Sequence, residues 1–241
     1  MSALHQQIMQ DAPSGYWPMD ETSGSTVYDR AGNGRNGTIT GGVTPSVGGP
    51  SGLRALAFDG TANAYVTIAD NAVWSSHAGA SGLWSYEVWL YRSSTGARKS
   101  FLSKGVAGGG NDYEILFEVT ATDTFDHPVL TTAGANVMSV LATGSSSLNT
   151  WQHVAATYDR AAQLLIVYVD GNEVGRDTTA SGTSSDTAGA LYFGTRNDGP
   201  LGSATYAWNG RMSNVAVYGT ALSAARIKSH YRAGLRHGVS Y

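Results

Sequence analysis

The chain has 241 residues, of which 41% are apolar and 14% are charged, with a formal net charge of −3 and 31 glycines. Ordinary soluble proteins carry about 25% charged residues, so this balance argues against a helical protein rich in Glu and Lys. The sequence holds no dense group of Lys and Arg, which excludes the electrostatic footprint of nucleic-acid binding. The absence of cysteine excludes disulfides, thiolate metal sites and cysteine nucleophiles.

The N-terminal residues lack the charged and then apolar pattern of a secretion signal, so we expect the protein to be made and to fold in a cytosol. Residues 3–10 predict a short amphipathic helix that ends before Pro13, with Leu4 and Ile8 one turn apart on the same face. No apolar run approaches the roughly 18 residues that a membrane-spanning helix needs.

Residues 16–20 predict a first strand, and residues 31–52, rich in glycine and with two prolines, predict an irregular loop. Short runs of aromatic and β-branched residues then follow at regular spacing. They cover residues 55–59, 64–69, 84–91, 100–104, 112–119, 128–132, 137–142, 151–158, 163–170, 172–177, 190–195 and 210–218. About a dozen short strands of this kind predict an all-β sandwich of two sheets.

The clearest predicted hairpin covers residues 163–174, where Asp170 and Gly171 supply the pair of positive φ angles of a type I′ turn. Its first strand is apolar on both faces, which predicts a central strand covered on both sides. Near the end of the chain, Ser223 is the predicted N-cap of a helix that places Ile227 on its apolar face and ends at Gly234.

Five phrases carry a family resemblance. They are Tyr16-Trp17-Pro18-Met19-Asp20-Glu21, Ala57-Phe58-Asp59-Gly60, Trp151-Gln152-His153-Val154-Ala155, Tyr168-Val169-Asp170-Gly171 and Gly210-Arg211-Met212-Ser213-Asn214-Val215-Ala216-Val217-Tyr218. Their order and spacing resemble the laminin-G-like (concanavalin A-like) domain. The resemblance implies an antiparallel jelly-roll sandwich with short terminal helices. We expect residues 1–12 to form a helical attachment segment, residues 13–235 the sandwich and residues 236–241 a tail.

The same resemblance implies calcium as the candidate bound ion, with Asp20, Glu21 and Asp59 as candidate ligands. Calcium prefers six to eight oxygen ligands, and its affinity follows the number of carboxylates. Many relatives carry an acidic residue in the last strand, where this chain has Ser213 and Asn214. That departure lowers the expected affinity, and the alternative is that the aspartates cap turns.

Aromatic side chains are the candidate sugar contacts. Trp89 shares a predicted strand face with a carboxylate, and residues 196–209 form a polar, glycine-containing loop that carries Arg196, Asp198, Tyr206 and Trp208. Loops at the rim of a sandwich often carry function. The alternative is that these rings pack against the sheets, since large apolar side chains are usually buried.

Catalysis has one candidate pair, Glu114 and Glu118, four residues apart on a predicted strand as in sandwich-fold glycosidases. Leu116 stands between them, where those enzymes usually carry Asp, so two solvated glutamates on an edge strand are the alternative. The six histidines are scattered, and His153 is expected to have a hydrogen-bonded packing role. We therefore expect no enzyme.

The main functional hypothesis is a non-catalytic structural or adhesion module on a phage virion, because the ends of the chain resemble laminin-G-like domains of tailed-phage proteins. Its partners would be other virion proteins or further copies of the chain, docked through the helix of Leu4 and Ile8. The alternative is a carbohydrate-binding module that recognises a cell-surface glycan. A glycoside hydrolase or lyase is the third hypothesis.

Overall fold

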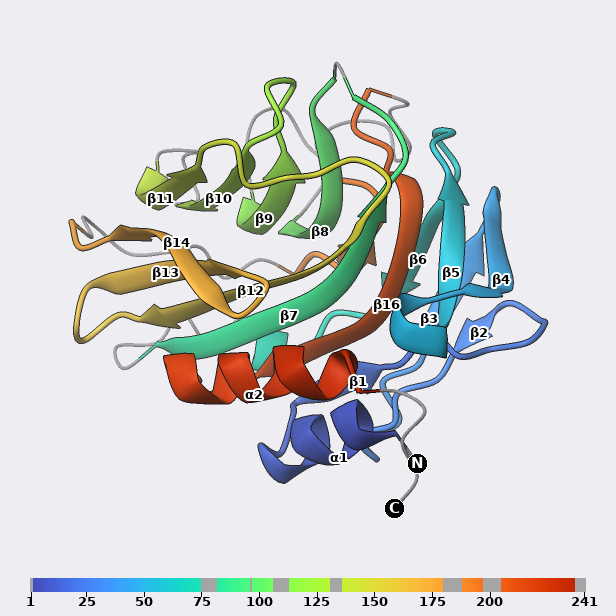
Figure 1. Ribbon diagram of the computed structural model, residues 1–241, viewed down its shortest axis with the longest axis horizontal. Helices are drawn as coiled ribbons and strands as arrows, with labels where there is room; N and C mark the ends of the chain where they lie inside the picture. The colour runs from blue at the N-terminus through green and yellow to red at the C-terminus, as the bar shows by residue number, and fades with distance from the viewer. Residues whose placement is uncertain are drawn as a thin grey trace.

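The computed structural model describes residues 2–74, 82–95, 97–105, 113–130, 136–179, 188–196 and 205–236. Within this part of the chain, two antiparallel sheets stack face to face, and two helices lie together against one of them (Figure 1). The predicted fold class, an all-β sandwich with short helices near both ends, is confirmed. No helix among the described residues is long and apolar enough to cross a membrane.

The first sheet is the one that the helices cover. Its path is β14 (Asn172–Asp177), β13 (Leu164–Val169), β12 (Trp151–Asp159), β7 (Leu83–Arg92), β16 (Asn209–Tyr218), β5 (Arg54–Asp59) and β4 (Val43–Gly48). A short strand, β1 (Gly15–Trp17), pairs with the far end of β16. The longest strands, β7 and β16, therefore lie side by side in the middle of this sheet.

The second sheet faces the first across the main core. Its path is β11 (Asn136–Ala142), β10 (Phe125–Leu130), β9 (Tyr113–Val119), β8 (Lys99–Gly105), β15 (Leu191–Phe193), β6 (Tyr65–Ile68), β3 (Gly37–Thr40) and β2 (Thr26–Val27). Its strands bury alternate side chains against the first sheet, as the two-residue period of a strand requires.

The alternation along β7 separates two cores. Trp84 and Tyr86 point between the sheets and join the main core, whereas Trp89 lies on the opposite face in a second apolar cluster. The two helices, α1 (Ala3–Gln10) and α2 (Ala224–Gly234), cover this second cluster (Figure 1). Leu4 and Ile8 of α1 are almost completely buried there. The apolar face of α1 is thus covered within the protein itself.

The cap of α2 and the hairpin of β13 and β14 are both predicted from local sequence. Ser223 caps α2 by accepting a hydrogen bond from the backbone N–H of Arg226, as expected. Asp170 and Gly171 both have positive φ in the turn between β13 and β14. However, β13 is the second strand from the edge and not a central one, although it is buried on both faces. The cover on its outer face comes from the second cluster under the helices.

One expectation about the N-terminal half is wrong. Residues 31–52 are not an irregular loop, because they form β3, β4 and a short 3-10 helix, η1 (Pro50–Gly52). Ile39 and Val43 supply apolar side chains to these strands, and Pro45 is tolerated because β4 is the last strand on the path of its sheet. The domain boundaries at residues 12 and 235 stay a prediction, and residues 237–241 lie outside the described part.

Candidate functional site

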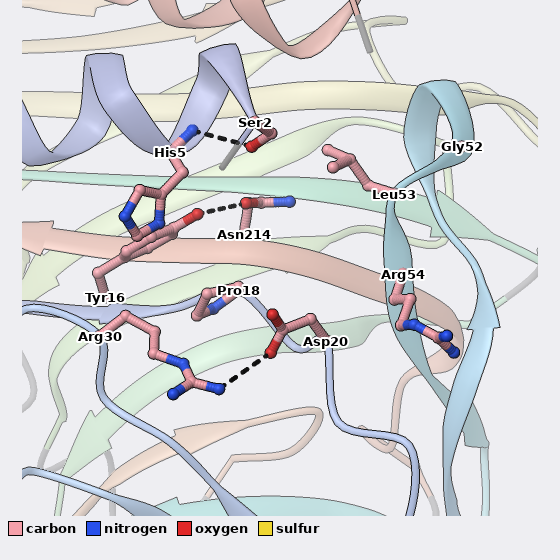
Figure 2. A pocket seen from close by; sticks show the side chains of 10 residues that line it. All are labelled: Ser2, His5, Tyr16, Pro18, Asp20, Arg30, Gly52, Leu53, Arg54 and Asn214. Carbon is pink, nitrogen blue, oxygen red and sulfur yellow. Dashed lines mark hydrogen bonds and ion pairs between the residues drawn. The ribbon is translucent and has the colours of Figure 1, made fainter. Parts of the chain in front are cut away.

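A cleft of about 500 Å³ opens where α1, the loop after β1 and the hairpin from β4 to β5 meet. Figure 2 shows these segments around a floor formed by β1 and β16. The lining residues are Ser2, His5, Tyr16, Pro18, Asp20, Arg30, Gly52, Leu53, Arg54 and Asn214. Because these positions are widely separated in the sequence, the cleft exists only in the folded chain.

A buried hydrogen bond between β1 and β16 forms the floor of the cleft. The hydroxyl of Tyr16 donates to Oδ1 of Asn214 at 2.6 Å, and Nδ2 of Asn214 donates to Oγ of Ser213 at 2.7 Å. Asn214 has a φ of 52°, in the left-handed region that asparagine tolerates better than most residues. The register of β16 against β7 shifts here, and such irregularities often re-aim side chains beside functional sites.

Two further residues with unusual backbone angles flank the floor. Met19 has a φ of 59° beside the lining residue Asp20, and Ser51 has a φ of 49° beside the lining residue Gly52. A residue held in a sparsely populated backbone region costs about 1–3 kcal/mol, and such residues gather at ligand-binding sites. Together with Asn214, these residues place three strained backbone positions at or beside the cleft.

The rim of the cleft carries both signs of charge. The guanidinium of Arg30 lies 3.7 Å from Oδ1 of Asp20, and each of these side chains is about half exposed (48% and 49%). On the opposite rim, the exposed guanidinium of Arg54 donates to the hydroxyl of Ser46. Exposed ion pairs of this kind contribute little to stability. Because the side chains of Asp20, Arg30 and Arg54 are exposed, their charges are accessible to a ligand.

His5 forms the wall that α1 contributes. Its ring lies 5.4 Å from the ring of Tyr16, and its backbone N–H donates to Oγ of Ser2, which caps α1. Burial lowers the pKa of His5, so the imidazole is mostly neutral at pH 7 and can both donate and accept a hydrogen bond. The cleft thus combines a carboxylate, two guanidiniums and a neutral imidazole, which suits a polar ligand rich in hydroxyl groups.

Two tryptophans predicted as sugar contacts are core side chains in the structure. Trp208 is completely buried between the sheets, where its ring meets Phe101 edge-on at 5.6 Å. Trp89 is 2% exposed beneath α2, with its ring stacked 5.8 Å from that of Tyr231 and in contact with Gly234. Neither indole presents a face to a ligand, which agrees with the packing alternative.

The loop residues Arg196 and Tyr206 belong to a charged cluster on the second sheet. The Arg196 guanidinium lies 3.9 Å from the centre of the Tyr206 ring and donates to Glu118 at 3.0 Å. Glu118 also accepts from Arg98 at 2.6 Å. The alternative of a solvated glutamate on an edge strand is therefore wrong for Glu118, which is completely buried on an interior strand. Asp198, like the side chain of Glu114, lies outside the described part.

The three candidate calcium ligands have separate roles. Oδ1 of Asp59 accepts hydrogen bonds from the backbone and the hydroxyl of Thr61, at 2.8 and 2.7 Å, and so closes a turn. Asp20 lines the cleft. Glu21 is nearly buried, where burial raises its pKa, and accepts from the backbone N–H of Tyr28 at 2.9 Å. In the described part of the chain, no group of three or more acidic or histidine side chains could hold a metal ion. Calcium binding by these residues stays a prediction.

Of the residues that line the cleft, only Asp20 is a candidate site residue in the sequence, and there it is a candidate calcium ligand. Asn214 stands out in the sequence only as a departure from a family pattern, and Tyr16 only as part of a strand. Nothing in the sequence singles out His5, Arg30 or Arg54, because they come from three separate segments.

Comparisons with known proteins establish the family. The chain belongs to the concanavalin A-like lectin/glucanases superfamily, whose laminin-G model matches residues 59–228. No curated protein is similar enough in sequence to match the chain.

Solved structures share the fold at low sequence identity. The binding domain of Paraclostridial Mosquitocidal Protein 1 superposes with a TM-score of 0.70 at 13% identity, covering 92% of this chain and 52% of its own length. The ligand-binding domain of botulinum neurotoxin serotype D, solved with N-acetylneuraminic acid, gives 0.67 at 11%, covering 96% and 52%. A Trypanosoma rangeli sialidase solved with sialic acid gives 0.64 at 14%, covering 90% and 32%. The chain therefore spans about half the length of the toxin domains and about a third of the sialidase.

Proposed function

We propose that this protein is a non-catalytic carbohydrate-binding module and that the cleft between α1 and the β4–β5 hairpin receives the sugar. The observation that carries the proposal is the cleft itself, in which the accessible charges of Asp20, Arg30 and Arg54 surround the fixed floor of Tyr16 and Asn214. Protein sites that recognise small ligands combine a preformed concave surface with a few precisely held polar groups.

A sugar is the ligand class that these groups favour. Its hydroxyls both donate and accept hydrogen bonds, so it benefits from a carboxylate that accepts, guanidiniums that donate and an imidazole that does either. Hydrogen bonds to charged groups contribute about 1.5–3 kcal/mol each, which is enough to select among hydroxyl positions. The half-buried ring of His5, which packs against the buried Tyr16 ring, adds a flat surface that an apolar sugar face can contact.

The binding module is proposed to be non-catalytic because the cleft lacks the usual pair of acids. Glycoside hydrolysis normally uses two carboxylates on either side of the scissile bond. Among the described residues that line the cleft, Asp20 is the single carboxylate. Glu118, one of the two glutamates considered for catalysis, is fixed between Arg98 and Arg196 on the second sheet.

The related structures support a cell-surface glycan as the ligand. Two of them were solved with N-acetylneuraminic acid or sialic acid, and the third is the binding domain of a mosquitocidal protein. With identities of 14% or less, these proteins share only the fold with this chain. They therefore add sialic acid to the sugars to be tested, and the cleft is the proposed binding site.

A glycan array tests the proposal. The wild-type protein is expected to bind a restricted set of glycans, and the Asp20→Asn variant to lose that binding. The exposed pair of Glu173 and Arg176 on β14 offers a matched control, because Glu173→Gln changes a carboxylate far from the cleft lining. An array on which the wild-type protein binds no glycan, or on which Asp20→Asn binds like wild type, would contradict the proposal.

The virion reading is compatible with glycan binding, since a module on a particle surface can adhere to a host through a sugar. Its support is the resemblance of the chain ends to tailed-phage proteins. The apolar docking face that it assigned to α1 is covered, with Leu4 and Ile8 at 1% and 0% exposure. A virion location and assembly with other copies stay proposals. Sedimentation of the purified protein tests whether copies of the chain associate.

A further inference from the structure

A chain of buried charged side chains lies beneath the two helices. At its centre, Glu87 of β7 accepts hydrogen bonds from His153 of β12 at 2.9 Å and from Nδ1 of His230 of α2 at 2.9 Å. The hydroxyl of Tyr218 on β16 also donates to Glu87. Glu87 is 2% exposed, and both histidines are completely buried. Buried charges of this kind are retained only where they are well paired.

The chain continues from the sheet to the end of α1. Nε2 of His230 lies 2.9 Å from Oδ2 of Asp11, the C-cap of α1. Arg226, one turn earlier on α2, contacts the same carboxylate at 2.9 Å and donates to the side chain of Gln7 at 3.1 Å. We call the sequence of Glu87, His230 and Asp11 the polar bridge. It connects β7 to α1 through a single imidazole.

Two carboxylates, each 2.9 Å from a ring nitrogen, favour a positive charge on that imidazole. Nδ1 of His230 donates to the Glu87 carboxylate and so carries a proton, whereas Nε2 lies 2.9 Å from Oδ2 of Asp11 and 3.4 Å from the guanidinium of Arg226. Burial lowers the pKa of His230, but the negative charges of Glu87 and Asp11 outweigh this effect and raise it. Arg226 opposes them. Burial likewise raises the pKa of Glu87, but the charges and hydrogen bonds of His230 and His153 outweigh it and hold that pKa far below its usual value.

The other groups around the polar bridge do not compete for this proton near neutral pH. Burial and the nearby Glu87 raise the pKa of Tyr218, and burial followed by the charge of Glu87 raises the pKa of Tyr16. Both phenols therefore stay neutral. His230 is the member of the polar bridge that loses its proton as the pH rises through its raised pKa.

The first helix is the element that depends most on this connection. It has only 8 residues, and an isolated helix of fewer than about 12 residues is marginal in water. Its apolar anchors are Leu4 and Ile8, and its polar anchors to α2 are Gln7 and Asp11. Ser2 and His5, at its other end, line the cleft.

We propose that the polar bridge is a charge-dependent latch, which holds α1 in place as the wall of the cleft and releases it when His230 loses its proton. This inference rests on the proposed function only in assigning a purpose to the cleft. Glu87, His230 and Asp11 are positioning residues, because none of the three lines the cleft. Loss of the proton leaves two carboxylates facing a neutral ring, and α1 is then held only by Arg226 and by its apolar side chains Leu4 and Ile8.

Hydrogen exchange measured by mass spectrometry tests the latch without any ligand. After correction for intrinsic exchange rates, the α1 peptide is expected to exchange at least tenfold faster at about pH 9 than at about pH 6. The β13 peptide in the core should stay unchanged. The Asp11→Asn variant, altered at the partly exposed end of the polar bridge, should show fast α1 exchange already at the lower pH. His153→Gln is the control, because it perturbs Glu87 without touching α1.

Nuclear magnetic resonance of the His5 ring gives a second readout, again without ligand. The pKa of His5 is lowered while α1 is docked, and it should return toward 6.5 in Asp11→Asn. Unchanged α1 exchange in Asp11→Asn, or α1 exchange that rises only together with that of β13, would overturn the latch. Because neither readout involves a sugar, failure of the latch is distinguishable from failure to bind glycans.

Discussion

The hydroxyl of Tyr16 donates a 2.6 Å hydrogen bond to Oδ1 of Asn214, and so joins the first strand of the chain to the last one. Both residues are buried at the floor of the cleft. The bond lies where the backbone of Asn214 is left-handed and the register of β16 shifts. The shape of the cleft therefore depends on a contact between residues 16 and 214, which only the closed sandwich can make.

Tyr16→Phe removes this hydroxyl and leaves Oδ1 of Asn214 without its donor. We expect the free energy of unfolding, measured with urea, to fall by about 1–2 kcal/mol, the usual cost of a buried acceptor left unpaired. Tyr28→Phe is the control, since the Tyr28 ring is 47% exposed and its removal of a hydroxyl should leave stability unchanged. Equal stability of wild type and Tyr16→Phe would show that the bond is not formed in solution.

Glu118→Gln tests the charged cluster on the second sheet. The substitution leaves Arg98 and Arg196 without their shared buried carboxylate, so we expect a loss of about 3–5 kcal/mol in the free energy of unfolding. Glu173→Gln breaks an ion pair on the surface and should have no measurable effect. If the two variants were equally stable, the cluster would not be a structural ion pair.

The pH dependence of stability follows from the sign of each pKa shift. The pKa of His230 is raised, so its contribution is complete below 6.5 and is lost as the pH rises through the folded-state value. The pKa of Glu87 is lowered, so its contribution is complete above 4.5 and is lost as the pH falls toward its folded-state value. The stability advantage of wild type over His230→Gln should therefore shrink with rising pH in urea titrations. An advantage that grew above neutral pH would contradict this assignment.

Gly234→Ala tests the packing of α2 on the sheet. A Cβ atom at this position would lie 2.4 Å from Cζ2 of Trp89, so the helix or the indole must shift. We expect a loss of about 1–3 kcal/mol, typical of overpacking, in thermal or urea unfolding. Gly219→Ala is the control, because the added Cβ would meet its nearest neighbour, Oγ of Ser14, at an ordinary 3.6 Å. Similar losses in both variants would argue against a close contact with Trp89.

The fold was accessible from the sequence because its signals are local. The turn at Asp170 and Gly171 and the cap at Ser223 depend on residues next to one another in the chain, and the structure confirms both. Residues 31–52 were harder, because their strands are short and glycine-rich and are stabilised by pairing with β5 and β6. Pairing partners of that kind are not visible in a local pattern.

The candidate site was mostly inaccessible from the sequence for a related physical reason. Alternation along β7 correctly separates Trp84 from Trp89, but it does not show that α2 covers the face of Trp89. A polar loop likewise gave no indication that Trp208 points into the core. Pairing of Glu87 with His153 and His230 depends on three elements that meet only in the folded protein.

Calorimetric titration of the cleft variants is the most direct test of the central claim. A glycan identified on the array should bind the wild-type protein, and Asp20→Asn and Arg54→Gln should each weaken that binding at least about tenfold, equivalent to about 1.4 kcal/mol. Glu173→Gln should bind like wild type, and all variants should unfold at the wild-type urea concentration. Binding that survives both cleft substitutions unchanged would place the sugar elsewhere and contradict the account.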